Sequence, residues 1–175
     1  VDGFGQKINE VAYWDRRLLT KPGNRMTLLK LHGSLDWYSW ATGADGSKGF
    51  RECGKTSLLD VYHTNDRQGN LQWPLNQGRP IIAVGTFIKE LVYNNALFFD
   101  LHWWFREALV SSELLIVAGY GFGDKGVNSR LVEALVLNRR LQVVIVHPCP
   151  ARLSASARPL WRRILNGEEK DFDRR

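Results

Sequence analysis

The chain has 175 residues, 44% of them hydrophobic, and a formal net charge of +6. This composition argues against intrinsic disorder, and the length fits one domain or a domain with a substantial insertion. No apolar run approaches the roughly 18 residues of a membrane span, and no secretory signal is recognised, so a cytoplasmic location and no membrane partner are expected. The chain begins with Val1 rather than methionine, and we therefore expect a fragment or a processed form.

Two features of the composition bear on partners. Residues 151–175 contain seven basic and four acidic residues. A basic tail suggests contact with nucleic acid or with another subunit, but the interrupting acidic residues favour a solvated tail. The two cysteines, Cys53 and Cys149, are too few for a four-thiolate zinc site.

The N-terminal half is predicted to hold one buried strand followed by irregular structure. Residues 26–32 form a short apolar run that ends at His32 and Gly33, a pattern typical of a buried strand. From about residue 38 to residue 80 turn-forming residues dominate, so we interpret this stretch as an irregular insertion. Within it, two short strands are expected at residues 58–62 and 71–73, joined by a turn at residues 66–70.

The C-terminal half alternates helices with strands. Residues 94–111 are apolar nearly all round and predict a largely buried helix. Continuous apolar runs at Leu114–Ala118 and Gln142–Val146 predict strands covered on both faces, with a helix over residues 127–140 between them. This alternation predicts an α/β fold with a Rossmann-like, mostly parallel sheet and flanking helices. A further short helix is expected at residues 158–165.

Polar groups are expected to converge where the strands end. Ligands of open α/β sheets bind at the carboxyl edge of the strands. His32 is placed there by the predicted strand, where an imidazole could act as a general base or could simply close the strand by a hydrogen bond. His147 follows the strand Gln142–Val146 and should project to the same edge if the strands are parallel.

A glycine-rich turn reading GYGFG lies at residues 119–123, between a predicted strand and a helix. Glycines allow close backbone approach, and the helix that follows offers free N–H groups to a phosphate. The spacing has one residue fewer than the dinucleotide fingerprint requires, so a tight structural turn is an equally good interpretation. Asn128 is either a helix cap or a hydrogen-bond partner of a ribose or an amide. Together these features favour a nucleotide site.

Two segments resemble the SIR2-like (sirtuin-related) family, in particular its bacterial antiphage-defence branch. Residues 30–37 (KLHGSLDW) resemble the histidine motif of the family. Residues 118–128 (AGYGFGDKGVN) are similar to its later glycine motif, in which a serine commonly stands in the place of Gly121. The opening residues 2–4 and the strand at 143–148 are also similar to that branch.

The resemblance implies a Rossmann-like, NAD-binding domain over residues 1–150, followed by a basic tail at 151–175. It implies an NAD+ glycohydrolase, which cleaves the nicotinamide–ribose bond with His32 as the base. The oxocarbenium-like centre formed as nicotinamide leaves would be met by an activated water. The implied nucleotide-binding positions are Gly33, Gly119, Tyr120, Gly121, Phe122, Asn128 and His147.

The chain departs from the family in two ways. It lacks the family's N-terminal phosphate loop and the motif that supplies a catalytic asparagine, so we expect an incomplete, C-terminal part of the fold. It also lacks the paired-cysteine zinc module of the deacetylases, with the insertion at about 38–80 in its place, which favours NAD hydrolysis without zinc. A homo-oligomer or a partner defence subunit is expected. The alternatives are a non-catalytic module that binds NAD or ADP-ribose, and a nucleic-acid-associated subunit of a defence complex.

Overall fold

The computed structural model describes residues 1–21, 23, 26–42, 52–57, 64–66, 68–75, 78–83 and 96–168. The chain divides into two compact units, Val1–Trp103 (unit 1) and Trp104–Arg175 (unit 2). The division falls within helix α2 (Ala96–Ser111), whose first half belongs to unit 1 and whose second half belongs to unit 2.

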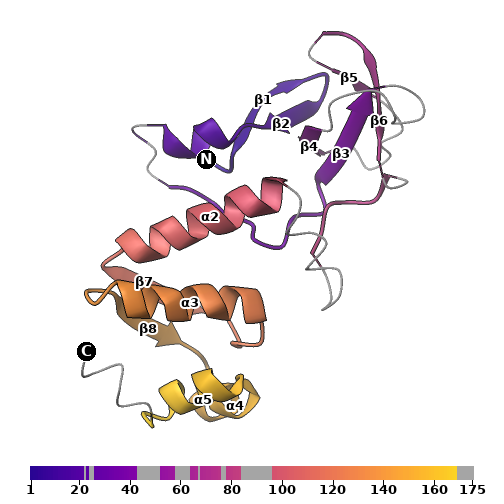
Figure 1. Cartoon of the computed structure of the whole chain (residues 1–175). Helices are drawn as coiled ribbons and strands as arrows, with labels where there is room; N and C mark the ends of the chain where they lie inside the picture. The colour runs from indigo at the N-terminus through magenta and orange to yellow at the C-terminus, as the bar shows by residue number, and fades with distance from the viewer. Residues whose placement is uncertain are drawn as a thin grey trace. The chain divides into compact units, whose positions relative to one another are not determined.

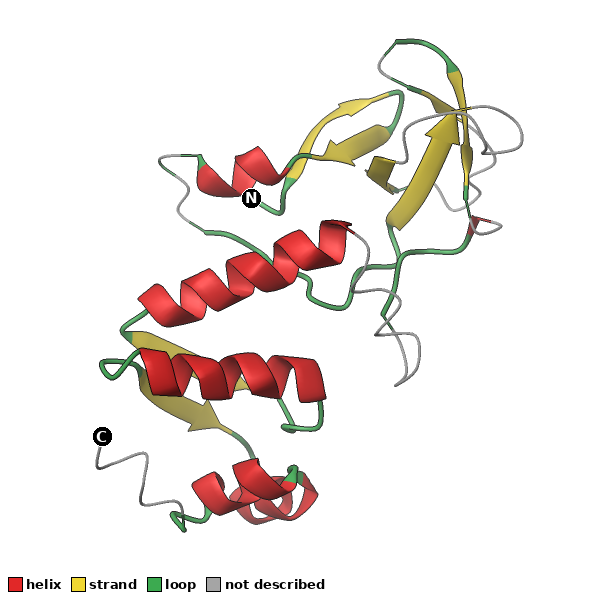
Figure 2. Ribbon diagram, viewed as in Figure 1, coloured by secondary structure: helices red, strands yellow, loops and turns green. Residues whose placement is uncertain are grey.

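Unit 1 contains a six-stranded sheet in the order β1-β2-β4-β3-β6-β5, in which every pair of neighbours is antiparallel (Figures 1 and 2). The hairpin between the first two strands turns at Asn9 and Glu10, both with positive φ, as two-residue hairpin loops require. The elements are β1 (Phe4–Ile8), β2 (Val11–Trp14), the 3-10 helix η1 (Arg16–Thr20), β3 (Trp37–Thr42), β4 (Glu52–Thr56), β5 (Thr64–Asn65) and β6 (Leu71–Pro74).

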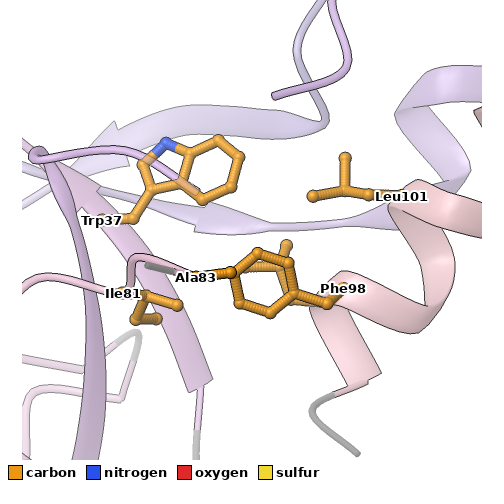
Figure 3. Packing of buried hydrophobic residues seen from close by; sticks show 6 residues of the cluster. Trp37, Ile81, Ala83, Phe98 and Leu101 are labelled. Atoms are coloured by element: carbon orange, nitrogen blue, oxygen red, sulfur yellow. The ribbon is translucent and has the colours of Figure 1, made fainter. Parts of the chain in front are cut away.

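Aromatic side chains form much of the core of unit 1. Trp37 on β3 packs with Ile81 and Ala83 and with the first turns of α2, where Phe98 and Leu101 are fully buried (Figure 3). A second buried cluster joins Val11, Tyr13, Tyr38 and Trp40 from β2 and β3. Large rings bury much apolar surface per residue, which suits a small sheet packed against one helix.

Unit 2 is built around two parallel strands, β7 (Leu114–Ala118) and β8 (Gln142–Val146), paired in register from Leu114↔Gln142 to Ala118↔Val146. A parallel pair needs a crossover connection, and α3 (Lys125–Leu137) supplies it. Two short helices follow, α4 (Pro150–Ser156) and α5 (Pro159–Leu165).

One face of the β7–β8 pair is covered and the other is exposed. Val117 is buried, whereas the apolar side chains that alternate with the covered face are 47–61% exposed, namely Leu114, Ile116, Val144 and Val146. The prediction that both faces of these strands are covered is therefore not met by the described residues.

The predicted mostly parallel, Rossmann-like sheet is wrong. Among the described residues, parallel pairing is confined to β7 and β8, and the larger sheet is antiparallel. The stretch at 38–80, interpreted as an irregular insertion, supplies strands to that sheet: β4, β5, β6 and nearly all of β3. These strands are short, two to six residues each, so each one carries little pattern of its own.

The strand predicted at residues 26–32 is also absent. The backbone there forms no strand, and Gly33 makes only an isolated antiparallel bridge with Ile82. Leu28 is 53% exposed, whereas Leu29 and Leu31 pack beside the core, so the apolar run lies along the core without entering a sheet.

The other predicted elements fare better. The helix at 94–111, the strands at 114–118 and 142–146, and the short helix at 158–165 are confirmed within two residues. The helix predicted at 127–140 is α3, which begins two residues earlier and ends three residues earlier. The strand at 71–73 is confirmed as part of β6, paired with β5 in a hairpin. The strand expected at 58–62 lies outside the described residues.

Candidate functional site

His32 lies in a turn of unit 1, against residues 81–83. The Ala83 N–H donates to the His32 carbonyl oxygen (2.9 Å), and the Ser34 N–H donates to the Ile81 carbonyl oxygen (3.1 Å). These bonds fix the backbone on both sides of Gly33. The His32 residue as a whole is exposed.

Gly33 is explained by this backbone packing. Its φ is +80°, and a Cβ added there would lie 2.0 Å from the Ile81 carbonyl oxygen. A side chain at this position would have to displace backbone, and the left-handed conformation adds strain for any other residue. The close approach of two chain segments therefore requires a glycine here, whether or not a nucleotide also contacts it.

Lys30 organises the polar groups near His32. Its Nζ donates to Ser34 Oγ (2.8 Å) and forms an ion pair with Asp36 (3.7 Å). The same ammonium lies 5.8 Å from the centre of the Trp37 ring, a cation–π contact. These contacts connect Lys30, at the start of the segment 30–37, to the residues at its end, Asp36 and the buried Trp37.

The glycine turn of unit 2 follows β7 directly. Gly119 has φ +68° and Phe122 has φ +52°. Phe122 is completely buried, at 5.0 Å from the Tyr120 ring and stacked at 4.5 Å on Trp161. The positive φ of Phe122 is thus held by packing on both sides. Its side chain belongs to the core of unit 2 and not to the surface of the turn.

Asn128 holds this turn to α3. Its Nδ2 donates to the Phe122 carbonyl oxygen (2.8 Å), and its Oδ1 accepts from the Tyr120 hydroxyl (2.8 Å). The cap of α3 is Asp124, whose carboxylate accepts from the Val127 N–H (3.0 Å). The helix-cap interpretation of Asn128 is therefore wrong, and its buried amide satisfies groups of the glycine turn.

Tyr120 acts as a hydrogen-bond donor at neutral pH. Burial, followed by the negative charge of Asp124, raises the pKa of Tyr120 to about 12, although the hydrogen bond to the Asp124 backbone and then the positive charge of Arg158 act to lower it. The protonated hydroxyl can therefore donate to Asn128 over the whole physiological range.

His147 leaves the sheet beside the glycine turn. Because Ala118 and Val146 are register partners, the next residues of the two strands, Gly119 and His147, emerge at the same carboxyl edge. Their predicted meeting at one edge is confirmed. His147 Nδ1 accepts the Cys149 N–H (3.0 Å), so in the neutral imidazole the proton is on Nε2, which can donate to a ligand. The convergence of His32 with these groups stays a prediction.

Sequence reasoning missed the contribution of the tail to this turn. Arg158 donates from Nε to the Gly123 carbonyl oxygen (2.8 Å), and its backbone N–H donates to Phe122 O (3.4 Å). Trp161 is buried against Phe122. The signal available was the apolar side of the helix predicted at 158–165, which required a surface to cover.

The described residues offer no metal centre: they contain no cluster of three or more His, Cys, Asp or Glu side chains placed to hold an ion. Both cysteines are free thiols. Burial, followed by the nearby Asp36 charge, raises the pKa of Cys53 to about 12, so this thiol is inert at neutral pH. In the same part of the chain, no helix combines the length and apolarity needed to cross a membrane.

No protein-family model matches the chain, and no curated protein matches it. The likeness to SIR2-like proteins therefore rests on the sequence resemblances described above.

Proposed function

We propose that this chain binds NAD at the glycine turn of unit 2 and hydrolyses the nicotinamide–ribose bond, with His32 as the base, as a SIR2-like defence effector would. The observation that carries the proposal is the β7–turn–α3–β8 arrangement. Its parallel register brings Gly119 and His147 to one carboxyl edge, which is where nucleotides bind in sheets with crossover helices.

The groups at this edge suit the adenosine diphosphate part of NAD. Gly119, Gly121 and Gly123 carry no side chains that would keep a ligand from the backbone, and a Cβ added at any of them meets no heavy atom within 4 Å. Asn128 and Tyr120 hold the turn in one conformation. The Nε2–H of His147 is a donor for a ribose hydroxyl or a ring nitrogen.

The proposed reaction needs a base and a water. Loss of nicotinamide leaves an electron-poor C1′ on the ribose, and a water oxygen bonds to that carbon. His32 accepts the proton that the water gives up, so the products are nicotinamide and ADP-ribose. The role of His32 rests on the resemblance of residues 30–37 to the family's histidine motif and on the exposure of this residue to solvent.

The test follows nicotinamide release from NAD. The protein should release nicotinamide, and His32→Ala should reduce the rate by about 100-fold or more, the range for loss of a general base. Leu35→Ala, which changes a 74% exposed side chain of the same segment, is the matched control and should retain the full rate. Equal rates for the parent and His32→Ala would exclude His32 as the base.

A second candidate is a binding module without turnover. The polar groups of the glycine turn are already paired with one another: Tyr120 with Asn128, and Asp124 with the α3 backbone. Such a turn offers a fixed binding geometry and no free base of its own. Calorimetric binding of NAD and ADP-ribose with no nicotinamide release would favour this candidate, and absence of both binding and release would overturn both.

A further inference from the structure

Arg158 is attached to the glycine turn but uses only part of its hydrogen-bonding capacity there. Its Nε–H donates to the Gly123 carbonyl oxygen, and its backbone N–H reaches Phe122 O. These two bonds hold the start of α5 against the turn. They also fix the plane of the guanidinium, because a bond at Nε leaves it little freedom to rotate.

Within the described part of the chain, the remaining donors of this guanidinium meet no acceptor. An arginine side chain has five N–H donors, and Nε accounts for one of them. Among the residues that the structure describes, no carboxylate lies within ion-pair distance of Arg158 and no acceptor meets its terminal nitrogens. The residue is exposed. A fixed, unpaired guanidinium is suited to bind a phosphate through two parallel hydrogen bonds.

The charged side chains around the turn also favour binding of an anion. Lys125 is the first residue of α3 and is exposed, and the first turn of that helix contains no acidic residue. A cation at a helix N-terminus opposes the helix dipole. The carboxylate of the preceding residue, Asp124, caps the helix through Val127. A bound phosphate would offset both cationic side chains.

The position of Arg158 is held by packing as well. Trp161, one turn further along α5, is only 3% exposed and stacks on the buried Phe122. The helix that carries Arg158 is therefore anchored to the turn by an aromatic contact, independently of the arginine. This provides a way to loosen the turn without removing its charge.

We infer that Arg158 is a phosphate-binding residue of the glycine turn, with its free guanidinium donors directed to the diphosphate of the ligand. The inference rests on the proposed function for the identity of the ligand, and it specifies the class: dinucleotides and nucleoside diphosphates in preference to nucleosides. The basic tail then contributes to a nucleotide site through one particular residue.

The experiment compares calorimetric affinities for NAD, ADP and adenosine in the full chain. Arg158→Gln should weaken binding of NAD and ADP by about 10- to 100-fold, the range for loss of charge-assisted hydrogen bonds, and should leave adenosine unchanged. Arg152→Gln removes the same charge from an exposed residue of α4 and should change nothing. The ADP affinity should also fall less steeply with added salt in Arg158→Gln than in the parent.

Two outcomes would overturn the inference. Unchanged ADP affinity in Arg158→Gln would show that the guanidinium does not meet phosphate. An equal loss for ADP and adenosine would show that Arg158 only positions the turn; Trp161→Leu, which loosens the turn but keeps the charge, supplies the reference for that pattern. NAD bound and cleaved with Arg158→Gln unaffected would reject the inference and keep the proposed function. If ADP binds and Arg158→Gln weakens that binding, but NAD is neither bound nor cleaved, the phosphate-binding role of Arg158 is kept and the proposed function is rejected.

Discussion

The two units of this chain differ in how their strands find their partners. In unit 2, β7 and β8 are joined by a single crossover helix, and each strand is a continuous run of apolar residues. In unit 1, β2 pairs with β4 so that Ala12 faces Lys55, and β3 pairs with β6 so that Trp40 faces Pro74. The first arrangement follows from local pattern. The second depends on contacts between distant segments.

The consequence is a difference in what stabilises each unit. The core of unit 1 gathers large aromatic rings from separate strands and from the start of α2. Unit 2 has a smaller set of buried side chains, and several of its polar groups are used to fix the glycine turn to the helices on either side. Substitutions at neighbouring residues can separate these contributions.

The largest effect is expected from adjacent residues of α2. Phe98 is fully buried in the core of unit 1, whereas Phe99 is 65% exposed. Phe98→Ala should lower the free energy of unfolding of unit 1 by about 3–5 kcal/mol, and Phe99→Ala by less than about 0.5 kcal/mol. Urea unfolding followed by tryptophan fluorescence measures both. Similar losses for the two variants would contradict the assignment of the unit 1 core.

A pair of glycines, one from each unit, should show the next largest difference. Gly33→Ala would place Cβ 2.0 Å from the Ile81 carbonyl oxygen at a left-handed φ, so a loss of about 2–4 kcal/mol is expected. Gly119→Ala also places a side chain at a left-handed φ, but the added Cβ meets no atom within 4 Å, so the free energy of unfolding should fall by only about 1–2 kcal/mol. The measurement is the denaturant midpoint of each variant. Equal losses would show that φ alone sets the cost at Gly33.

The side-chain amide of Asn128, which holds the glycine turn, should make a smaller contribution to the free energy of unfolding. Asn128→Ala removes the shorter of the two hydrogen bonds at the Phe122 carbonyl, leaving that from the Arg158 N–H, and the shorter of the two bonds that the Tyr120 hydroxyl donates, leaving that to the Asp124 carbonyl. The loss of two hydrogen bonds should lower the free energy of unfolding of unit 2 by about 1–2 kcal/mol. Ser129→Ala, at the exposed neighbouring position, is the control and should stay within about 0.5 kcal/mol. Thermal unfolding of both variants tests this, and equal melting temperatures would contradict the bracing role.

The smallest effect concerns the ion pairs of Glu133 in unit 2. Hydrogen bonds from Arg106, then from Arg130, lower the pKa of Glu133. The stability they contribute is present above the ordinary pKa of a glutamate, about 4.3, and is lost as pH falls through the lowered value. Glu133→Gln should therefore be less stable than the parent by under about 1 kcal/mol at pH 7. The difference should vanish in strong acid.

Denaturant midpoints at pH 7 and pH 2 measure this linkage. Glu113→Gln, which removes an exposed carboxylate of the same unit, is the control and should match the parent at pH 7. A difference between Glu133→Gln and the parent that persists unchanged at pH 2 would show that the carboxylate charge is not its cause.

The candidate site repeats the contrast between the units. Sequence pattern placed Gly119 and His147 at one edge, because two continuous apolar runs joined by a helix leave little choice but parallel pairing. Of the two roles considered for Asn128, the helix cap is wrong, since Asp124 caps α3 and the Asn128 side chain bonds to the glycine turn. The contact of Asn128 with a nucleotide stays a prediction. Sequence pattern did not foresee Arg158 or the burial of Phe122, since both depend on where α5 packs.

The sequence by itself determined the elements whose information is local: the helix before β7, the two parallel strands, the turn between β7 and α3, and the short helix of the tail. Only the tertiary structure decided that residues 37–74 build an antiparallel sheet, and that the apolar run before His32 lies along a core without forming a strand. The physical reason is the order of the strands. In unit 2 the paired strands are consecutive and joined by one crossover helix, so the pattern of strand, helix and strand predicts the pairing. In unit 1, β2 pairs with β4 and β3 pairs with β6, and these non-consecutive neighbours bury aromatic side chains that no single segment contains.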